Sequence, residues 1–183
     1  PFFYLFLAAL VCSFYIRTAG LALLAGVALA LFLGKNWKFL TAVLTAYIIL
    51  ILPWILREKT SQGNTYIDQL LQINPYRPEL GQVGLNDILV RVFANAQRYI
   101  GREIPNGLFN IDTGDLGAFK WVAGIVITLA IAGGLFKLEK YRYLIAAYLA
   151  TALGILLLWP ESWFGVRFLL PIVPLLLFCL LNG

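Results

Sequence analysis

Apolar residues along the chain gather into long runs that mostly short polar breaks separate. Each run covers roughly 16–20 residues, the length that an α-helix needs to cross about 30 Å of hydrocarbon. The runs cover residues 1–16, 18–34, 39–56, 118–136, 141–159 and 164–181. A transmembrane β-barrel would instead show short strands of alternating polarity. The pattern therefore predicts an all-α fold, a polytopic membrane helical bundle of about six transmembrane helices.

One long polar region interrupts the apolar pattern between the third run and the fourth. This region covers residues 57–117. The chain then divides into transmembrane helices one to three in residues 1–56, one long loop in 57–117, and transmembrane helices four to six in 118–183.

The short breaks predict how the chain is oriented in the membrane. One break carries Lys35 and Lys38, and the break after the fourth run carries Lys137, Lys140 and Arg142. Short loops rich in Lys and Arg face the cytoplasm. The long loop then lies on the outer side. We expect an integral, multi-pass protein of a bacterial inner membrane, with this loop in the periplasm.

The long loop carries helical patterns of its own. Residues 64–73 and 86–104 both place apolar side chains at helical spacing. The second segment begins with Asn86 and Asp87, both of which favour a helix N-cap. Three arginines lie mostly off its apolar face: Arg91, Arg98 and Arg102. Such a helix suits the membrane surface, and packing on a neighbouring soluble domain is the alternative. The outer loop is therefore predicted to be partly helical.

The composition supports a membrane protein. Of the 183 residues, 61% are hydrophobic and 13% are charged, whereas soluble domains have about 45–50% apolar and about 25% charged residues. The formal net charge is +5, but Lys and Arg in membrane proteins mostly set orientation and contact anionic head groups. We expect membrane lipids as partners and no nucleic acid.

Histidine and cysteine usage limits the chemistry. The sequence contains no histidine, and histidine is the commonest metal ligand and a frequent general base. Acid–base chemistry would therefore rely on carboxylates, Lys or Tyr. Cys12 and Cys179 lie in apolar runs without metal-ligand spacing, which indicates buried hydrophobic side chains. The sequence predicts no metal site and no cofactor.

Charged residues at the outer ends of the apolar runs are the candidate binding residues. Arg17 lies between the first two runs, Arg57 follows the third, and Glu161 and Arg167 flank the start of the last. Charges beside hydrocarbon snorkel, pair or mark a site. The arginines are therefore either anchors to lipid phosphates or ligands of an anionic, lipid-linked group, because a guanidinium holds a phosphate in two-point contact. Glu161 either pairs with Arg167, contacts substrate, or is solvated.

Three motifs resemble those of one membrane enzyme family. They are "RTAG" from Arg17, "PWILR" ending at Arg57, and "RFLLPIVP" from Arg167 to Pro174. In this order they resemble the membrane half of GT-C-fold glycosyltransferases, namely the dolichyl-phosphate-mannose protein mannosyltransferases and bacterial aminoarabinose transferases. The resemblance implies transfer of a sugar, with inversion, from a polyprenyl-phosphate donor to an acceptor on the outer face. It implies that Arg17 and Arg167 hold the lipid phosphate and that Arg57 lies at the rim.

The resemblance does not assign a catalytic residue. The family's catalytic aspartate, in its first outer loop, is expected upstream of Pro1, so we expect the sequence to be part of a longer chain. The alternative function is a non-catalytic membrane subunit or scaffold of a larger complex, with other membrane subunits as partners. A transporter is disfavoured because the charges gather at the outer ends of the runs and not near the bilayer midplane.

Overall fold

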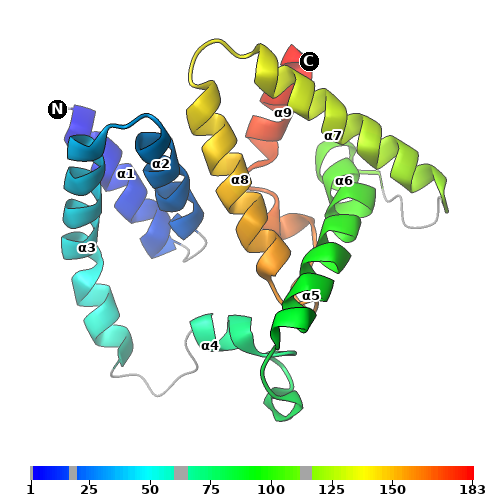
Figure 1. The fold of residues 1–183 in the computed structure, drawn as a ribbon, viewed down its shortest axis with the longest axis horizontal. Helices are drawn as coiled ribbons and strands as arrows, with labels where there is room; N and C mark the ends of the chain where they lie inside the picture. Colours follow the sequence, from blue (N-terminus) through cyan, green and yellow to red (C-terminus); the bar gives the residue numbers. More distant parts are fainter. Residues whose placement is uncertain (1, 17–19, 60–65, 112–116) are drawn as a thin grey trace. The chain divides into compact units, whose positions relative to one another are not determined.

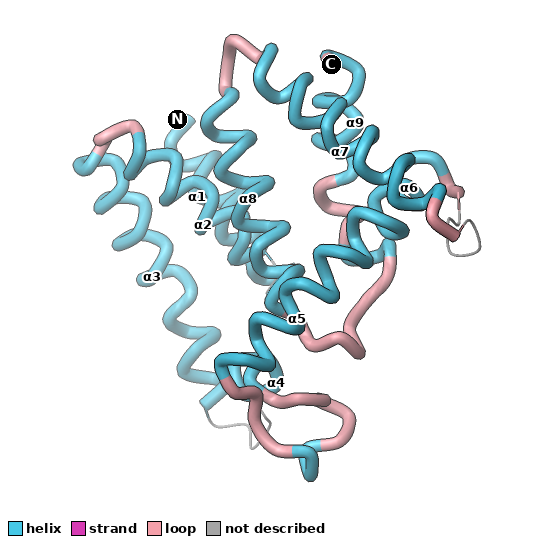
Figure 2. The backbone as a smooth tube through the Cα atoms, turned by 45° about the vertical axis from the view of Figure 1, so that its right-hand side comes forward, coloured by secondary structure: helices cyan, strands magenta, loops and turns pink. Residues whose placement is uncertain are grey.

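The protein is all-α over the part of the chain that the structure describes. The computed structural model describes residues 2–16, 20–59, 66–111 and 117–183. Within these ranges the chain forms helices and turns and no strand, apart from one isolated bridge between Gln72 and Gln82 (Figure 2). The all-α part of the predicted fold class is thus confirmed. The chain divides into two compact units, Pro1–Gly63 with Tyr143–Ala152, and Asn64–Arg142 with Leu153–Gly183.

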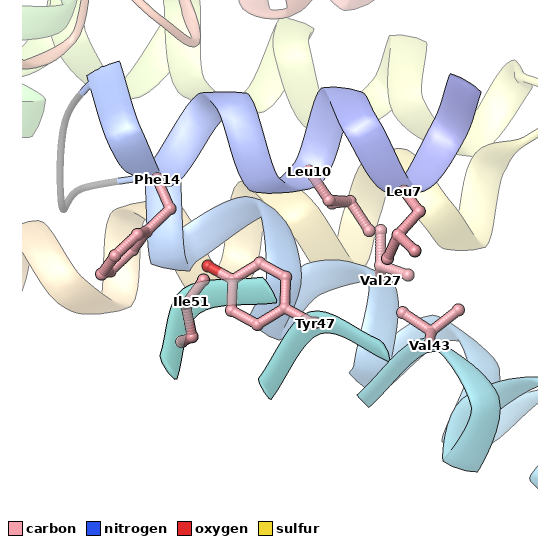
Figure 3. Packing of buried hydrophobic residues seen from close by; sticks show 7 residues of the cluster. All are labelled: Leu7, Leu10, Phe14, Val27, Val43, Tyr47 and Ile51. Atoms are coloured by element: carbon pink, nitrogen blue, oxygen red, sulfur yellow. The ribbon is translucent and has the colours of Figure 1, made fainter. Parts of the chain in front are cut away.

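The first unit holds three apolar helices, α1 (Phe2–Ile16), α2 (Leu21–Leu33) and α3 (Trp37–Lys59) (Figure 1). Their shared core contains Leu7, Leu10, Phe14, Val27, Val43, Tyr47 and Ile51 (Figure 3). The α1 and α3 members recur at intervals of three or four residues, which places them on one face of each helix.

Part of α8 (Arg142–Leu158) packs against α2 within the first unit. A Cβ atom on Gly26 would lie only 2.6 Å from Cα of Tyr148, so glycine is required for this close approach. The Thr151 hydroxyl donates a hydrogen bond to the carbonyl oxygen of Ala22 at 2.9 Å. Small residues and hydroxyl groups are the usual means by which helices associate where hydrocarbon surrounds them.

The second unit is built around α7 (Phe119–Lys137) and α9 (Val173–Asn182). A Cβ atom on Gly134 would lie 1.7 Å from the carbonyl oxygen of Cys179, so the two helices are in backbone contact there. Cys179 is buried, as the sequence predicts, whereas Cys12 is exposed and contradicts the same expectation.

The described residues of the loop between the third and fourth runs form several helices, which confirms the prediction that this loop is partly helical. It contains α4 (Tyr66–Leu71), the short η2 (Pro78–Leu80) and a continuous helical segment made of α5 (Leu85–Arg98), the π-turn η3 (Tyr99–Glu103) and α6 (Ile104–Phe109). The N-cap prediction is wrong. The N-cap is Gly84, whose N–H donates to the Asp87 carboxylate at 2.9 Å, so Asp87 acts from the third helical position.

Among the residues that the structure describes, two helices are long and apolar enough to cross a membrane, Trp37–Arg57 in α3 and Phe119–Lys137 in α7. The other four predicted spans form shorter apolar helices: Phe2–Ile16, Leu21–Leu33, Arg142–Leu158 and Val173–Asn182. Length and composition therefore support two of the six predicted spans.

The last predicted span is not one continuous helix. A 3-10 turn, η4 (Val166–Phe168), and further turns precede α9, which begins only at Val173. Pro171 has no N–H to donate and disfavours helical geometry at the residue before it. Pro174 lies in the first turn of α9, where a missing N–H costs nothing. The two prolines thus set where this helix starts.

Candidate functional site

The four predicted binding residues fall in different parts of the structure. Arg17 lies outside the described residues. Arg57 is exposed near the end of α3, in the first unit, while Glu161 and Arg167 are exposed in the second unit. Glu161 and Arg167 thus lie in the same unit. That Arg17 and Arg167 hold one phosphate stays a prediction.

The segment that joins α8 to η4 folds around its own aromatic side chains. The Trp159 ring lies edge-on to the rings of Phe168 and Trp163, with centroids 4.6 and 5.9 Å apart. The backbone N–H of Trp163 donates to the Pro160 carbonyl at 2.8 Å. Gly165 has φ +122°, a conformation that side chains with a Cβ rarely adopt. This local packing fixes the segment without needing regular structure.

Two arginines lie on these aromatic rings. The Arg98 guanidinium carbon is 4.7 Å from the Phe164 ring centroid, and that of Arg167 is 4.7 Å from the Phe168 ring centroid. One Arg98 nitrogen also donates to the backbone carbonyl of Glu161 at 3.0 Å. We call Arg98, Trp159, Trp163, Phe164, Arg167 and Phe168 the arginine–aromatic cluster.

The cluster leaves guanidinium donors accessible. Arg167 is exposed and makes no hydrogen bond or ion pair to a described residue. A cation over a ring gains about 0.5–1 kcal/mol in an exposed site, and this contact uses none of the guanidinium N–H groups as hydrogen-bond donors. Edge N–H groups in a fixed plane are the donors that bind phosphate in two-point contact. The arrangement is thus able to bind an anion next to the apolar start of α9.

Polar side chains of α5 fasten α8 and the cluster together. Asn95 Nδ2 donates to the carbonyl oxygens of Leu157 at 3.0 Å and Trp159 at 2.8 Å. Arg91 donates to the carbonyl oxygens of Leu70 and Gln72 at 2.8 Å each, and of Leu158 at 3.3 Å. The last carbonyls of a helix have no partner within the helix. Arg91 and Asn95 donate hydrogen bonds to some of these carbonyls at the end of α8.

Burial of these groups is nearly complete. Arg91 is 6% exposed and Asn95 is 2% exposed. Burial lowers the pKa of Arg91, and the negative charges of Glu161 and Asp87 act in the opposite direction. The guanidinium stays protonated because its ordinary pKa is so high. Glu161 therefore contributes a favourable charge to Arg91 through space, while its backbone carbonyl holds Arg98.

A buried tyrosine and a buried carboxylate lie in the π-turn next to α5. Tyr99 and Glu103 are each 3% exposed. Burial raises the pKa of Tyr99 to about 12, the charge of Glu103 adds to this rise, and Arg98 opposes it. The hydroxyl is therefore protonated near neutral pH, and it has no hydrogen-bond partner among the described residues. Tyr99 is thus not a general base at neutral pH.

Sequence reasoning missed the part played by Asn95. It placed Arg91 and Arg98 off the apolar face, which the structure confirms, but it expected nothing of the neutral residue between them. The available signal was spacing, because positions 91, 95 and 98 form one polar stripe on a helix.

Comparison with known proteins does not extend this picture, since no family model, curated protein or solved structure matches the chain.

Proposed function

We propose that this chain belongs to a membrane glycosyltransferase that moves a sugar from a polyprenyl-phosphate donor to an acceptor on the outer face. The observation that carries the proposal is the arginine–aromatic cluster, where Arg98 and Arg167 present guanidinium edges beside an apolar segment. A lipid phosphate needs this combination, because its head is anionic and its tail is a hydrocarbon. Membrane lipids and the sugar donor are the proposed partners.

The proposed step is a displacement at the anomeric carbon of the sugar. The acceptor oxygen forms a bond to that carbon, the bond from the carbon to the phosphate oxygen breaks, and the phosphate leaves with the electron pair. A carboxylate base takes the acceptor proton. Arg98 and Arg167 stabilise the charge that develops on the leaving phosphate, as preorganised cations do in such sites. The base is not assigned to any residue of this chain.

The proposed membrane arrangement extends the two supported spans. Helices α3 and α7 cross the bilayer, and the shorter apolar helices α1, α2, α8 and α9 complete the six-helix bundle together with their flanking turns. The region around α4, α5 and α6 then lies on the outer, periplasmic side. Arg17 and Arg57 belong to the same outer face in this arrangement, as expected of the motifs that contain them.

Mass spectrometry of the gently purified natural protein tests the proposal. Wild type is expected to retain a polyprenyl phosphate or its sugar ester, and an Arg98→Ala, Arg167→Ala double variant is expected to lose it. An Arg17→Ala variant tests the second predicted phosphate ligand in the same assay.

Arg77→Ala is the matched control, because Arg77 is an exposed arginine outside the cluster. Ordinary phospholipid that is bound equally by all variants would refute the proposal. It would leave the arginines as membrane anchors and favour the alternative of a non-catalytic subunit or scaffold.

A further inference from the structure

Helix α5 turns its apolar face away from the protein. Leu85 is 84% exposed, Leu89 69%, Val90 64% and Phe93 66%. Residues 85, 89 and 93 are spaced by four and position 90 adjoins them, so the four side chains form one stripe along the helix. We call these four residues the α5 apolar stripe.

The opposite face of α5 carries the polar side chains, and these point into the protein. Arg91 and Asn95 are both buried and donate to backbone carbonyls, including those at the end of α8. A helix that lies between a protein core and water has the reverse arrangement, with apolar side chains inside. The exposed face of α5 is therefore suited to contact with an apolar medium outside the protein.

We propose that the α5 apolar stripe lies in the outer leaflet of the membrane, at the boundary between lipid head groups and acyl chains. The η3 turn that continues α5 packs on α7, one of the two candidate spans, so the stripe belongs to the same packed unit as a helix that acyl chains would surround. In the adjoining η3 turn, a Cβ atom on Gly101 would contact the Trp121 ring at 3.5 Å. A Cβ atom on Gly124 of α7 would lie 2.0 Å from the Ile100 carbonyl oxygen.

These contacts lie near the first residue of α7, the predicted outer end of the span. Further along α7, exposed side chains require a lipid environment if the helix crosses a membrane: Val122, Ile125, Val126 and Leu129. The segment that continues α5 thus packs directly on a helix whose exposed side chains are apolar as far as Phe136. Acyl chains that surround α7 are then within reach of the same unit that carries the stripe.

The chemistry of the stripe selects hydrocarbon over charged head groups. None of its four residues is charged, and the exposed neighbours Asn86 and Gln97 are neutral. The nearby Asp87 carboxylate already accepts the Gly84 N–H. Insertion should therefore not require anionic lipid, and a helix bound in this way lies about 5–10 Å into the boundary region.

Depth-dependent fluorescence quenching of the full chain in vesicles tests this location. Single cysteines that carry an environment-sensitive dye are placed at Leu89 and Phe93 in a Cys12→Ala background. Cys179 stays in place because it is fully buried. Glu79→Cys, exposed in η2, is the water-facing control, and Leu129→Cys in α7 is the membrane-inserted control. The quenchers are iodide in water and lipids with a nitroxide either near the head group or near the chain end.

Support requires one pattern in both phosphatidylcholine vesicles and vesicles that also contain phosphatidylglycerol. Dyes at 89 and 93 are quenched most by the nitroxide near the head group, the dye at 129 by the nitroxide near the chain end, and the dye at 79 by iodide alone. Quenching at 89 and 93 by iodide alone would overturn the proposal, because the stripe would face water.

Two further results would also overturn it. Protection at 89 and 93 from every quencher would mean that a protein covers the stripe, either a second copy or another subunit. Loss of lipid quenching at 129 would mean that α7 does not span the bilayer. None of these readouts depends on sugar transfer, so the proposal can fail while the proposed function stands, and the reverse.

Discussion

Asn95→Ala removes the smallest polar group that holds the end of α8. The change deletes the two hydrogen bonds to the carbonyls of Leu157 and Trp159, at 3.0 and 2.8 Å. Each hydrogen bond contributes about 0.5–1.5 kcal/mol net, and a buried carbonyl left without a partner adds to the loss. We expect the free energy of unfolding to fall by about 2–3 kcal/mol.

The expected shift in melting temperature follows from the size of the chain. For about 150–250 residues, 1 kcal/mol moves Tm by about 2–4 °C, so Asn95→Ala should lower Tm by about 4–12 °C. The assay is thermal unfolding in detergent, followed by a thiol-reactive dye in a Cys12→Ala background. Cys179 then reports unfolding, because it is fully buried in the folded protein.

Two further variants separate hydrogen bonding from packing. Asn95→Leu keeps the branching at Cγ and fills the space with a larger apolar side chain while it removes both donors, so it should cost at least about as much as Asn95→Ala. Gln97→Ala is the matched control, since Gln97 is exposed on the same helix, and it should leave Tm within about 1 °C of wild type. An Asn95→Leu melting temperature equal to that of Gln97→Ala would refute the reasoning, because the donors would then contribute nothing.

Other perturbations follow from single contacts. Gly124→Ala should prevent native packing of α7, because the added Cβ would lie 2.0 Å from the Ile100 carbonyl; Gly133→Ala, with open space around it, should be neutral or raise Tm slightly in the same thermal assay. The free energy of unfolding should fall between about pH 10 and 12, because Tyr99 loses its proton at a lower pH in the unfolded chain than in the folded protein. Tyr99→Phe should flatten that part of a curve of Tm against pH. An unchanged slope would contradict the raised pKa of Tyr99. Gly165→Ala should lower the free energy of unfolding by about 1 kcal/mol, and Tm by about 2–4 °C, because the φ of +122° at this position disfavours a Cβ. An unchanged Tm would mean that the turn readjusts.

The helices that the sequence predicted best are those whose ends carry local signals. The fourth apolar run was predicted over residues 118–136, and α7 covers Phe119–Lys137. Polar and basic residues end this run abruptly, so composition alone locates the helix. The last run was predicted as one span over 164–181, but α9 begins only at Val173. A hydrophobicity pattern does not distinguish an apolar turn from an apolar helix.

The sequence singled out some of the residues around the candidate site and missed others. Glu161 and Arg167 were selected because charges at the edge of an apolar run are costly. Periodicity also identified the two faces of α5, but it does not say which face meets the protein. Which face is buried depends on the carbonyls at the end of α8 that have no partner within that helix. They are far from Asn95 in the sequence and become its neighbours only in the fold.

The π-turn within the α5–α6 segment makes its two halves unequal in their response to a change of chain length. The Ile104 N–H bonds to the Tyr99 carbonyl, five residues earlier, so the turn accommodates one residue more than an α-turn would. Deletion of a single residue within Tyr99–Glu103 would restore a plain α-helix and leave the flanking faces in phase. The same deletion between Arg91 and Tyr99 would rotate the preceding part of the helix by about 100°, and would carry Arg91 out of reach of its carbonyls.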